Sequence, residues 1–131
     1  MGVYRFEDLR VWQAAKRQCD RVGALVKRPE FERDRELSSQ MNDASLSVML
    51  NISEGFLRRR DKELLQFLRY STASNGELRA CYHAAHGRGY LGGPERDDLL
   101  ELNASIGRMT RRFQDSVRGG TRTKDQGRTK D

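Results

Sequence analysis

The sequence predicts an all-α protein: an antiparallel, up-down-up-down four-helix bundle with a disordered basic C-terminal tail. Apolar residues recur three and four positions apart in four separate segments, which is the spacing of one helix face. No segment alternates apolar and polar residues as a half-buried strand does, and the segments are joined by short connections. With 36% hydrophobic and 34% charged residues, the chain has the balance of long helices that each bury one stripe.

The first two predicted helices are marked by their apolar stripes and by the residues at their ends. Asp8 stands at the cap or first turn of the first helix, and Pro29 lies just past its end. The second helix is expected to stop at Gly55, because glycine readily adopts the left-handed conformation that terminates a helix. The first stripe is Trp12, Ala15, Cys19, Val22 and Val26, and the second is Leu37, Met41, Ala44, Val48 and Ile52.

The last two predicted helices are equally regular. The third begins near Asp61, which can cap it, and runs toward Gly87, whereas the fourth opens at Gly93-Pro94 because proline is favoured at the first helical position. Within the third helix, Gly76 costs about 1 kcal/mol of helix stability against alanine, and it would allow a close helix contact. The third stripe is Leu64, Leu68, Leu78, Tyr82 and Ala85, and the fourth is Leu99, Leu102, Ile106, Met109 and Phe113.

One bundle domain is expected over residues 1–117, followed by a disordered tail over residues 118–131, because no apolar residue occurs from Gly119 onward. No apolar run approaches the roughly 20 residues of a membrane span, and no signal peptide opens the sequence. Cys19 and Cys81 are therefore interpreted as reduced, buried thiols in a cytoplasmic protein.

Short motifs along most of the chain carry a family resemblance. Asn51-Ile52-Ser53-Glu54-Gly55 follows Ser47-Val48-Met49-Leu50 directly, and it is similar to an Asn-Ile-Ala-Glu-Gly motif. The other motifs are Phe6-Glu7-Asp8-Leu9, Val11-Trp12-Gln13, Lys62-Glu63, Phe67-Leu68, Glu77-Leu78 and Gly89-Tyr90-Leu91. Together, over about residues 6 to 117, they resemble the small bacterial four-helix-bundle proteins encoded in intervening sequences of 23S ribosomal RNA genes.

That resemblance implies a four-helix bundle that assembles into a ring-shaped homopentamer. The same fold serves as the accessory variability protein of diversity-generating retroelements, a basic pentamer that binds nucleic acid and the reverse transcriptase. In such a ring every basic patch is repeated around the symmetry axis, and phosphate contacts from several patches add through counterion release. The resemblance therefore implies a homo-oligomer, with nucleic acid as an expected partner.

Basic residues cluster in three places and, with a net charge of +6, predict nucleic-acid binding. Guanidinium groups suit this role because they grip phosphate oxygens in a bidentate fork. Each cluster alone is also typical of an ordinary solvated helix surface, so the prediction depends on their acting together. The candidate residues are Arg58, Arg59 and Arg60; Arg108, Arg111 and Arg112; and Lys16, Arg17 and Arg21.

A polar pair on the second helix suggests a structural lock. Asn51 and Glu54 are three positions apart and share a face with Val48, so they are expected to look toward the bundle or a subunit seam. A carboxylate in that position needs donors, which Ser74 or Asn75 could supply. A catalytic role is disfavoured because no second acid or histidine is placed to work with Glu54.

No catalytic, metal or cofactor site is predicted. His83 and His86 lie one turn apart, but the Glu-x-x-His pairs of bundle metal sites are missing. Gly87-Arg88-Gly89 lacks the preceding strand of a phosphate-binding loop. The sequence therefore predicts a non-catalytic, homo-oligomeric accessory protein that binds RNA or DNA. The alternative is a scaffold for another protein, such as the product of a neighbouring gene.

Overall fold

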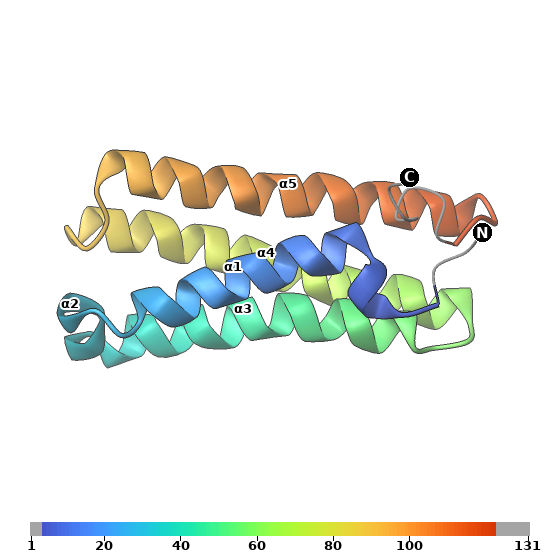
Figure 1. Ribbon diagram of the computed structural model, residues 1–131, viewed down its shortest axis with the longest axis horizontal. Coiled ribbons are helices and arrows are strands. Elements are labelled where there is room, and N and C mark those ends of the chain that lie inside the picture. Colours follow the sequence, from blue (N-terminus) through green and yellow to red (C-terminus); the bar gives the residue numbers. More distant parts are fainter. Residues whose placement is uncertain (1–3, 123–131) are drawn as a thin grey trace.

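Four long helices make up most of the protein, as the computed structural model shows for residues 4–122 (Figure 1). No strand occurs within these residues, so the predicted all-α class is confirmed. A short helical turn, η1, precedes the first long helix, and a short helix, α2, follows it. The elements are η1 (Phe6–Asp8), α1 (Arg10–Leu25), α2 (Pro29–Arg33), α3 (Arg35–Phe56), α4 (Asp61–Gly87) and α5 (Gly93–Arg118).

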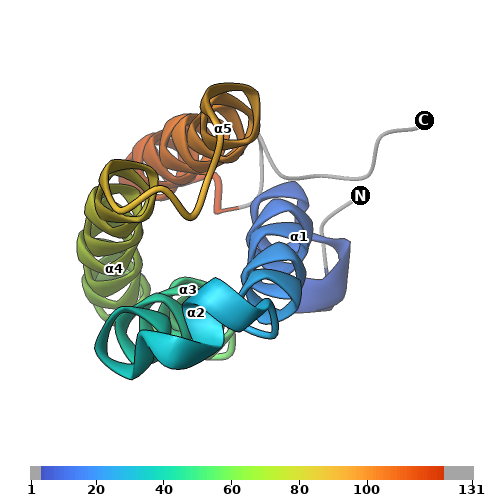
Figure 2. The ribbon, with the colours of Figure 1, turned by 90° about the vertical axis from the view of Figure 1, so that its left-hand side faces the viewer.

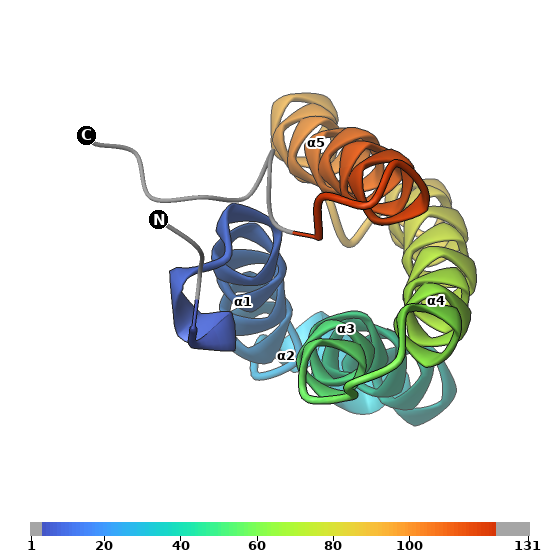
Figure 3. The same cartoon turned by 90° about the vertical axis from the view of Figure 1, so that its right-hand side faces the viewer.

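The four long helices surround a common core (Figures 2 and 3). α3 and α4 share the most extensive contact, α5 packs against α4, and α1 packs against both α3 and α5. As a result, α1 and α4 lie on opposite sides of the core, as do α3 and α5. Each long helix therefore buries one face and leaves the opposite face to water.

The core consists of two apolar clusters, one toward each end of the bundle. The stripes predicted for the second and third helices are buried in full, which confirms those faces. On α1 the buried face is rotated relative to the prediction: Val11, Ala14 and Gln18 face the core, whereas Trp12 and Cys19 are only partly buried. The prediction assigned Trp12 and Cys19 to the core face of α1, but the small residue Ala14 and the polar residue Gln18 occupy core positions instead.

A layer of buried amides separates the two apolar clusters. Gln18 Nε2 donates to Asn75 Oδ1 at 3.1 Å, and Asn103 Nδ2 donates to Gln18 Oε1 at 3.0 Å. Asn75 and Asn103 also bond each other reciprocally: each side-chain amide donates to the other residue's backbone carbonyl, at 3.0 and 3.1 Å. Tyr82 Oη completes the layer by donating to Gln18 Oε1 at 3.1 Å, and burial raises the pKa of this phenol. Side chains from α1, α4 and α5 are thus joined inside the core.

Three expected helix ends differ in detail from the prediction. Asp8 lies in η1 rather than at a cap, and α1 begins after Leu9 without a side-chain cap. Pro29 begins α2, whose Phe31 is fully buried, instead of only terminating the preceding helix. Asp61 is the first residue of α4, and its carboxylate pairs with Arg122 at 3.1 Å rather than capping the helix. The predicted start of the fourth helix at Gly93, with proline next, is confirmed.

Gly55 and Gly76 differ from their predicted roles. Gly55 is the penultimate residue of α3, so the helix ends one residue later than predicted, and Gly55 is buried with a negative φ instead of adopting the left-handed conformation. A Cβ there would meet Phe67 Cβ at 2.9 Å and Leu64 Cδ1 at 3.0 Å, so this glycine lets α3 and α4 approach closely. Gly76, predicted to allow a close contact, has no atom within 4 Å of a Cβ built on it.

The chain contacts the bundle beyond the predicted domain boundary at residue 117, because α5 continues to Arg118 and the residues after it bind the turn between α3 and α4. Arg122 Nη1 donates to the backbone carbonyl of Phe56 at 3.4 Å, and another guanidinium nitrogen donates to the carbonyl of Arg58. This side chain therefore ties the chain after α5 to the turn between α3 and α4. The disorder predicted for residues 118–131 does not apply to 118–122, and residues 123–131 lie outside the described part of the chain.

Removing one amide of the buried layer should destabilise the fold. Asn103→Ala removes the hydrogen bonds that Asn103 Nδ2 donates to Gln18 Oε1, to Asn75 Oδ1 and to the Asn75 carbonyl, which should lower the free energy of unfolding by about 2 kcal/mol. Urea denaturation measures the change. The matched control is Asn42→Ala at an exposed position of α3, which should have little effect. Equal losses in the two variants would show that the layer has no special role in stability.

Alanine at Gly55 should also be destabilising, although alanine is the better helix former. The added methyl group would overlap Phe67 and Leu64, and we expect a loss of about 1 to 2 kcal/mol. At Gly23 of α1, where a Cβ meets no atom within 4 Å, the same substitution should raise stability by up to about 1 kcal/mol. Thermal unfolding of both variants checks the signs, and a higher Tm for Gly55→Ala would contradict the close helix approach.

Candidate nucleic-acid interface

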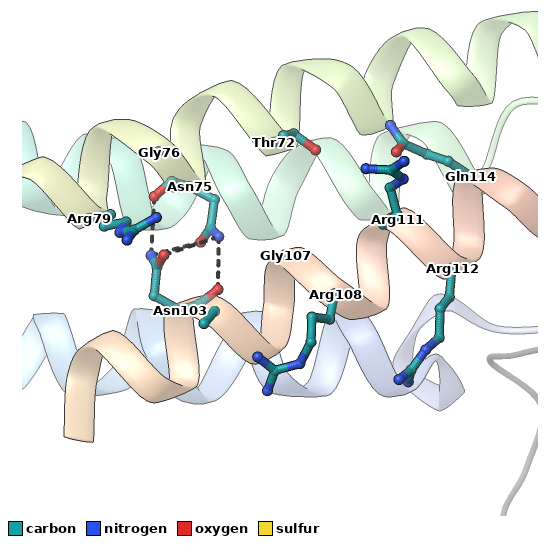
Figure 4. A pocket seen from close by; sticks show the side chains of 11 residues that line it. Thr72, Asn75, Gly76, Arg79, Asn103, Gly107, Arg108, Arg111, Arg112 and Gln114 are labelled. Carbon is teal, nitrogen blue, oxygen red and sulfur yellow. Dashed lines mark hydrogen bonds between the residues drawn. The ribbon is translucent and has the colours of Figure 1, made fainter. Parts of the chain in front are cut away.

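An open groove of about 650 Å³ runs along the seam between α4 and α5 (Figure 4). Its lining includes four arginines, Arg79 from α4 and Arg108, Arg111 and Arg112 from α5. No acidic side chain is among the lining residues. The groove is therefore a concave surface of one charge sign, which is the arrangement that attracts an anion.

Small residues open this groove. Thr72 and Gly76 of α4 and Ala104 and Gly107 of α5 line it, and they recur at helical spacing on the facing sides of the two helices. Neither glycine has a positive φ, so the backbone does not require glycine at either position. A Cβ on Gly107 would have only Asn75 Nδ2 nearby, at 4.0 Å. Space is left on the seam because side chains that could fill it are absent.

Three of the four groove arginines have no acidic partner among residues 4–122. Arg108 pairs with Glu101 at 3.1 Å, but both side chains are largely exposed, so the pair is weak. Arg79, Arg111 and Arg112 have no ion-pair or hydrogen-bond partner among residues 4–122. In Figure 4, Arg79 and Arg111 extend into the space between the helices, whereas Arg108 and Arg112 project from the other side of α5.

The bottom of the groove is polar as well as basic. Asn75 and Asn103 line it, but their amides are occupied by each other and by the buried layer. Gln114 differs, because it is 9% exposed and its side-chain amide has no hydrogen-bond partner within residues 4–122. Figure 4 shows this amide extending from α5 toward α4. Trp12 Nε1 is the one buried side-chain nitrogen or oxygen without a partner in residues 4–122, so the Gln114 amide keeps contact with solvent, and its donor and acceptor are available to a ligand.

The arginine run at the turn between α3 and α4 is only partly available. Arg58 Nη2 donates to Glu54 Oε2 at 2.7 Å, and the guanidinium carbon lies 4.9 Å from the centre of the Phe67 ring. Its charge is therefore partly compensated locally. Arg59 and Arg60 are exposed, and their side chains have no ion-pair partner among the described residues.

The predicted polar lock exists in a different form. Asn51 Nδ2 donates to the backbone carbonyl of Ser47 at 2.8 Å, and the hydroxyls of Ser47 and Ser74 are 2.6 Å apart across α3 and α4. The prediction that Glu54 takes donors from Ser74 or Asn75 is wrong: Glu54 is exposed and binds Arg58 instead. The apolar face of α3 passes through Val48, Ile52 and Gly55, which turns Glu54 outward.

The third predicted cluster lies on the exposed face of α1. Lys16 Nζ is 2.8 Å from Asp20 Oδ2, and this hydrogen bond raises the pKa of the lysine. Arg17 and Arg21 are exposed. The three clusters thus lie on different elements, and of the three it is the α5 cluster that borders the groove.

The histidines and cysteines do not converge. The Nδ1 atom of His86 is 2.9 Å from the backbone carbonyl of Leu91, and His83 is exposed. Cys19 and Cys81 are free thiols, but they are partly buried and not fully buried as predicted, and desolvation raises the pKa of the Cys81 thiol. Within residues 4–122, no group of three or more His, Cys, Asp or Glu side chains could hold a metal ion. None of the helices in this part of the chain combines the length and the apolar character of a membrane span.

Comparison with known families decides the relationship that the motifs suggest. The family model of the 23S rRNA-intervening sequence protein matches residues 7–112, from η1 to most of α5. The chain belongs to this family. A search of curated proteins gave no match. The matched residues include every residue that lines the groove except Gln114, so the groove lies almost entirely within the region matched by the family model.

Two residues that line the groove, Arg79 and Gln114, were not predicted from the sequence. Arg79 is a single arginine in the middle of α4, without basic neighbours in the sequence, so no cluster marked it. Gln114 was overlooked because glutamine on a long helix is usually solvated. Helical spacing could have found Arg79, since it follows Gly76 and Thr72 on one side of α4.

Proposed function

We propose that this 23S rRNA-intervening sequence protein is a non-catalytic accessory protein that binds RNA or DNA through arginine-rich surfaces. The observation that carries the proposal is the groove between α4 and α5, which is lined by four arginines and by no acidic side chain. Ordinary solvated helix faces mix both signs, as α1 does with Lys16 and Asp20. A groove without acids departs from that pattern.

The chemistry of the groove suits phosphate. Guanidinium groups present fixed donor pairs that match phosphate oxygens, and they stay charged at every physiological pH. The net charge of +6 adds a long-range attraction that raises the encounter rate with a polyanion. Because backbone phosphates are the same in every sequence, we expect shape-directed or phosphate-directed binding rather than recognition of a base sequence.

We further propose that the helices run in antiparallel, up-down-up-down order and that the protein works as a homo-oligomer. Short turns between consecutive long helices support the first point. Exposed apolar side chains on α3 and α4 support the second: Leu50 is 54% exposed, Leu57 65% and Tyr70 49%. Leu57 is the C-cap residue of α3, and it lies seven positions after Leu50, in line with the same stripe of the helix. The family resemblance favours a ring of five copies.

Binding to structured RNA and to duplex DNA should weaken steeply as salt rises. With three or four arginines on phosphates, we expect the logarithm of the association constant to fall with a slope of about −2 to −4 against the logarithm of salt concentration. For RNA with single-stranded segments, the double substitution Arg111→Gln/Arg112→Gln should make this slope shallower by about 1.5. Fluorescence anisotropy at four salt concentrations measures both slopes.

The matched control for charge is Arg33→Gln/Arg35→Gln, which removes two exposed arginines at the far end of the bundle. Equal effects of the two double substitutions would mean that net charge alone drives binding and that the groove has no part in it. Absence of binding by the unaltered protein at low salt would contradict the proposed function. The scaffold for another protein would then be the better hypothesis.

Self-association is tested separately. Leu57→Glu introduces a charge into the exposed apolar stripe of α3, and we expect it to lower the mass measured by light scattering to that of one chain. Tyr4→Glu is the control, because Tyr4 is 77% exposed but lies outside α3 and α4. A monomeric mass for the unaltered protein would reject the oligomer, and an unchanged mass for Leu57→Glu would reject this stripe as the contact.

A further inference from the structure

The dimensions of the groove suit a narrow ligand. Its α4 wall extends from Thr72 to Arg79, which is about 10 Å at the rise of an α-helix. A volume of about 650 Å³ is in the range of sites that hold small ligands or short segments of a chain. Proteins usually read a duplex by inserting a protruding helix or ribbon into one of its grooves. A concave seam between two helices instead receives a single strand.

The glycines of the groove have no other explanation in the fold. Gly76 and Gly107 each lie inside a long helix, where glycine costs about 1 kcal/mol against alanine. Neither has a positive φ, and a Cβ would meet no atom at Gly76 and only one, at 4.0 Å, at Gly107. The protein could therefore carry alanine at both positions without a clash. The effect of the two glycines is to leave open space in the groove between α4 and α5.

Polar groups reach this space from both walls. Arg79 extends from α4 and Arg111 from α5, and neither has a partner among residues 4–122 (Figure 4). Gln114, a residue that is 9% exposed, adds an amide whose donor and acceptor have no partner within residues 4–122 and remain in contact with solvent. A strand with alternating phosphate and ribose groups would supply acceptors for the guanidinium groups and a hydroxyl for the amide.

The lining also argues against a peptide helix as the ligand. Helix-in-groove recognition depends on apolar anchors that enter an apolar channel, but the lining holds no large apolar side chain. No aromatic residue is among the lining residues either, so bases would not be stacked as they are on single-strand platforms. What the groove offers is charge and hydrogen bonds, which select the sugar-phosphate backbone and not the bases.

We propose that the α4–α5 groove binds one single strand of nucleic acid. The strand is held by its backbone between Arg79 and Arg111, with Gln114 bonding a sugar or phosphate oxygen. This inference rests on the proposed function and names the form of nucleic acid that the groove takes. Duplex regions bind elsewhere on the basic surface, for example at the exposed Arg59 and Arg60.

Filling the groove without changing its charge tests the proposal. Gly76→Leu places a side chain in the open space, and the assay compares a labelled 12-nucleotide oligouridine with a blunt RNA duplex by anisotropy. We expect oligouridine binding to weaken roughly tenfold, or about 1.4 kcal/mol. Duplex binding should change less than about twofold, and the Tm should not fall, because leucine is the better helix former. Loss of binding with unchanged or higher stability cannot come from unfolding.

Gly23→Leu is the matched control, since Gly23 also lies inside a helix with no atom within 4 Å of a Cβ but is remote from the groove. It should leave oligouridine binding unchanged. A second variant, Arg79→Gln, should make the salt slope for oligouridine shallower by about 0.7, the contribution of one phosphate contact to a single strand.

The outcomes separate this inference from the proposed function. Unchanged oligouridine binding by Gly76→Leu, with normal duplex binding, would overturn the groove as a single-strand site and leave nucleic-acid binding intact. A change in the mass of Gly76→Leu by light scattering would also overturn it, because the seam would then be a contact between copies of the chain. Failure of the unaltered protein to bind either probe would instead contradict the proposed function itself.

Discussion

The reciprocal amide contact between Asn75 and Asn103 is the constraint on which the rest of the structure depends. Each side chain bonds the other residue's backbone, so α4 and α5 have one axial alignment in which both amides are satisfied. Gln18 adds α1 to the same layer. Apolar contacts alone tolerate sliding because they are not directional. A buried amide does not, since any shift of a helix turn would leave donors and acceptors unpaired in the core.

The relative position of the two walls of the groove is set by the buried amide layer. Gly76 follows Asn75 directly in α4, and Ala104 follows Asn103 in α5, so the residues that hold the seam together adjoin those that open it. The alignment also sets how far Arg79 stands from Arg111 along the groove. Stability and the candidate site are therefore coupled through neighbouring positions of the same two helices. A change in the amide layer would move both walls of the groove.

The sequence was sufficient for the fold class and for most of the buried faces, because large apolar residues at helical spacing rarely have another explanation. It was insufficient where the decisive quantity was the distance to another helix. Gly55, at the end of a helical pattern, lies against Phe67, whereas Gly76, inside one, lies against open space, and the local sequence at neither position indicates which helix is near. Glu54 was misplaced for a related reason, since its partner is Arg58 on its own helix end. Buried Gln18 could not be recognised because its partners lie 57 and 85 positions away.

Which arginines remain available to a ligand depends on competition for nearby carboxylates. Glu54 lies four positions before Arg58 and pairs with it, which is the favoured order of acid and base along a helix. Asp115 lies four positions after Arg111, the less favoured order, and is within 3.5 Å of Arg118 instead. Arg111 is thus left without a partner inside residues 4–122, although a carboxylate is within helical reach. In the conspicuous run 58–60 the charge of Arg58 is partly neutralised, and in the α4–α5 seam that of Arg108 is, whereas Arg79, Arg111 and Arg112 have no partner within residues 4–122. Their positive potential arises from the order of charges along α5 and not from the density of arginine in the sequence.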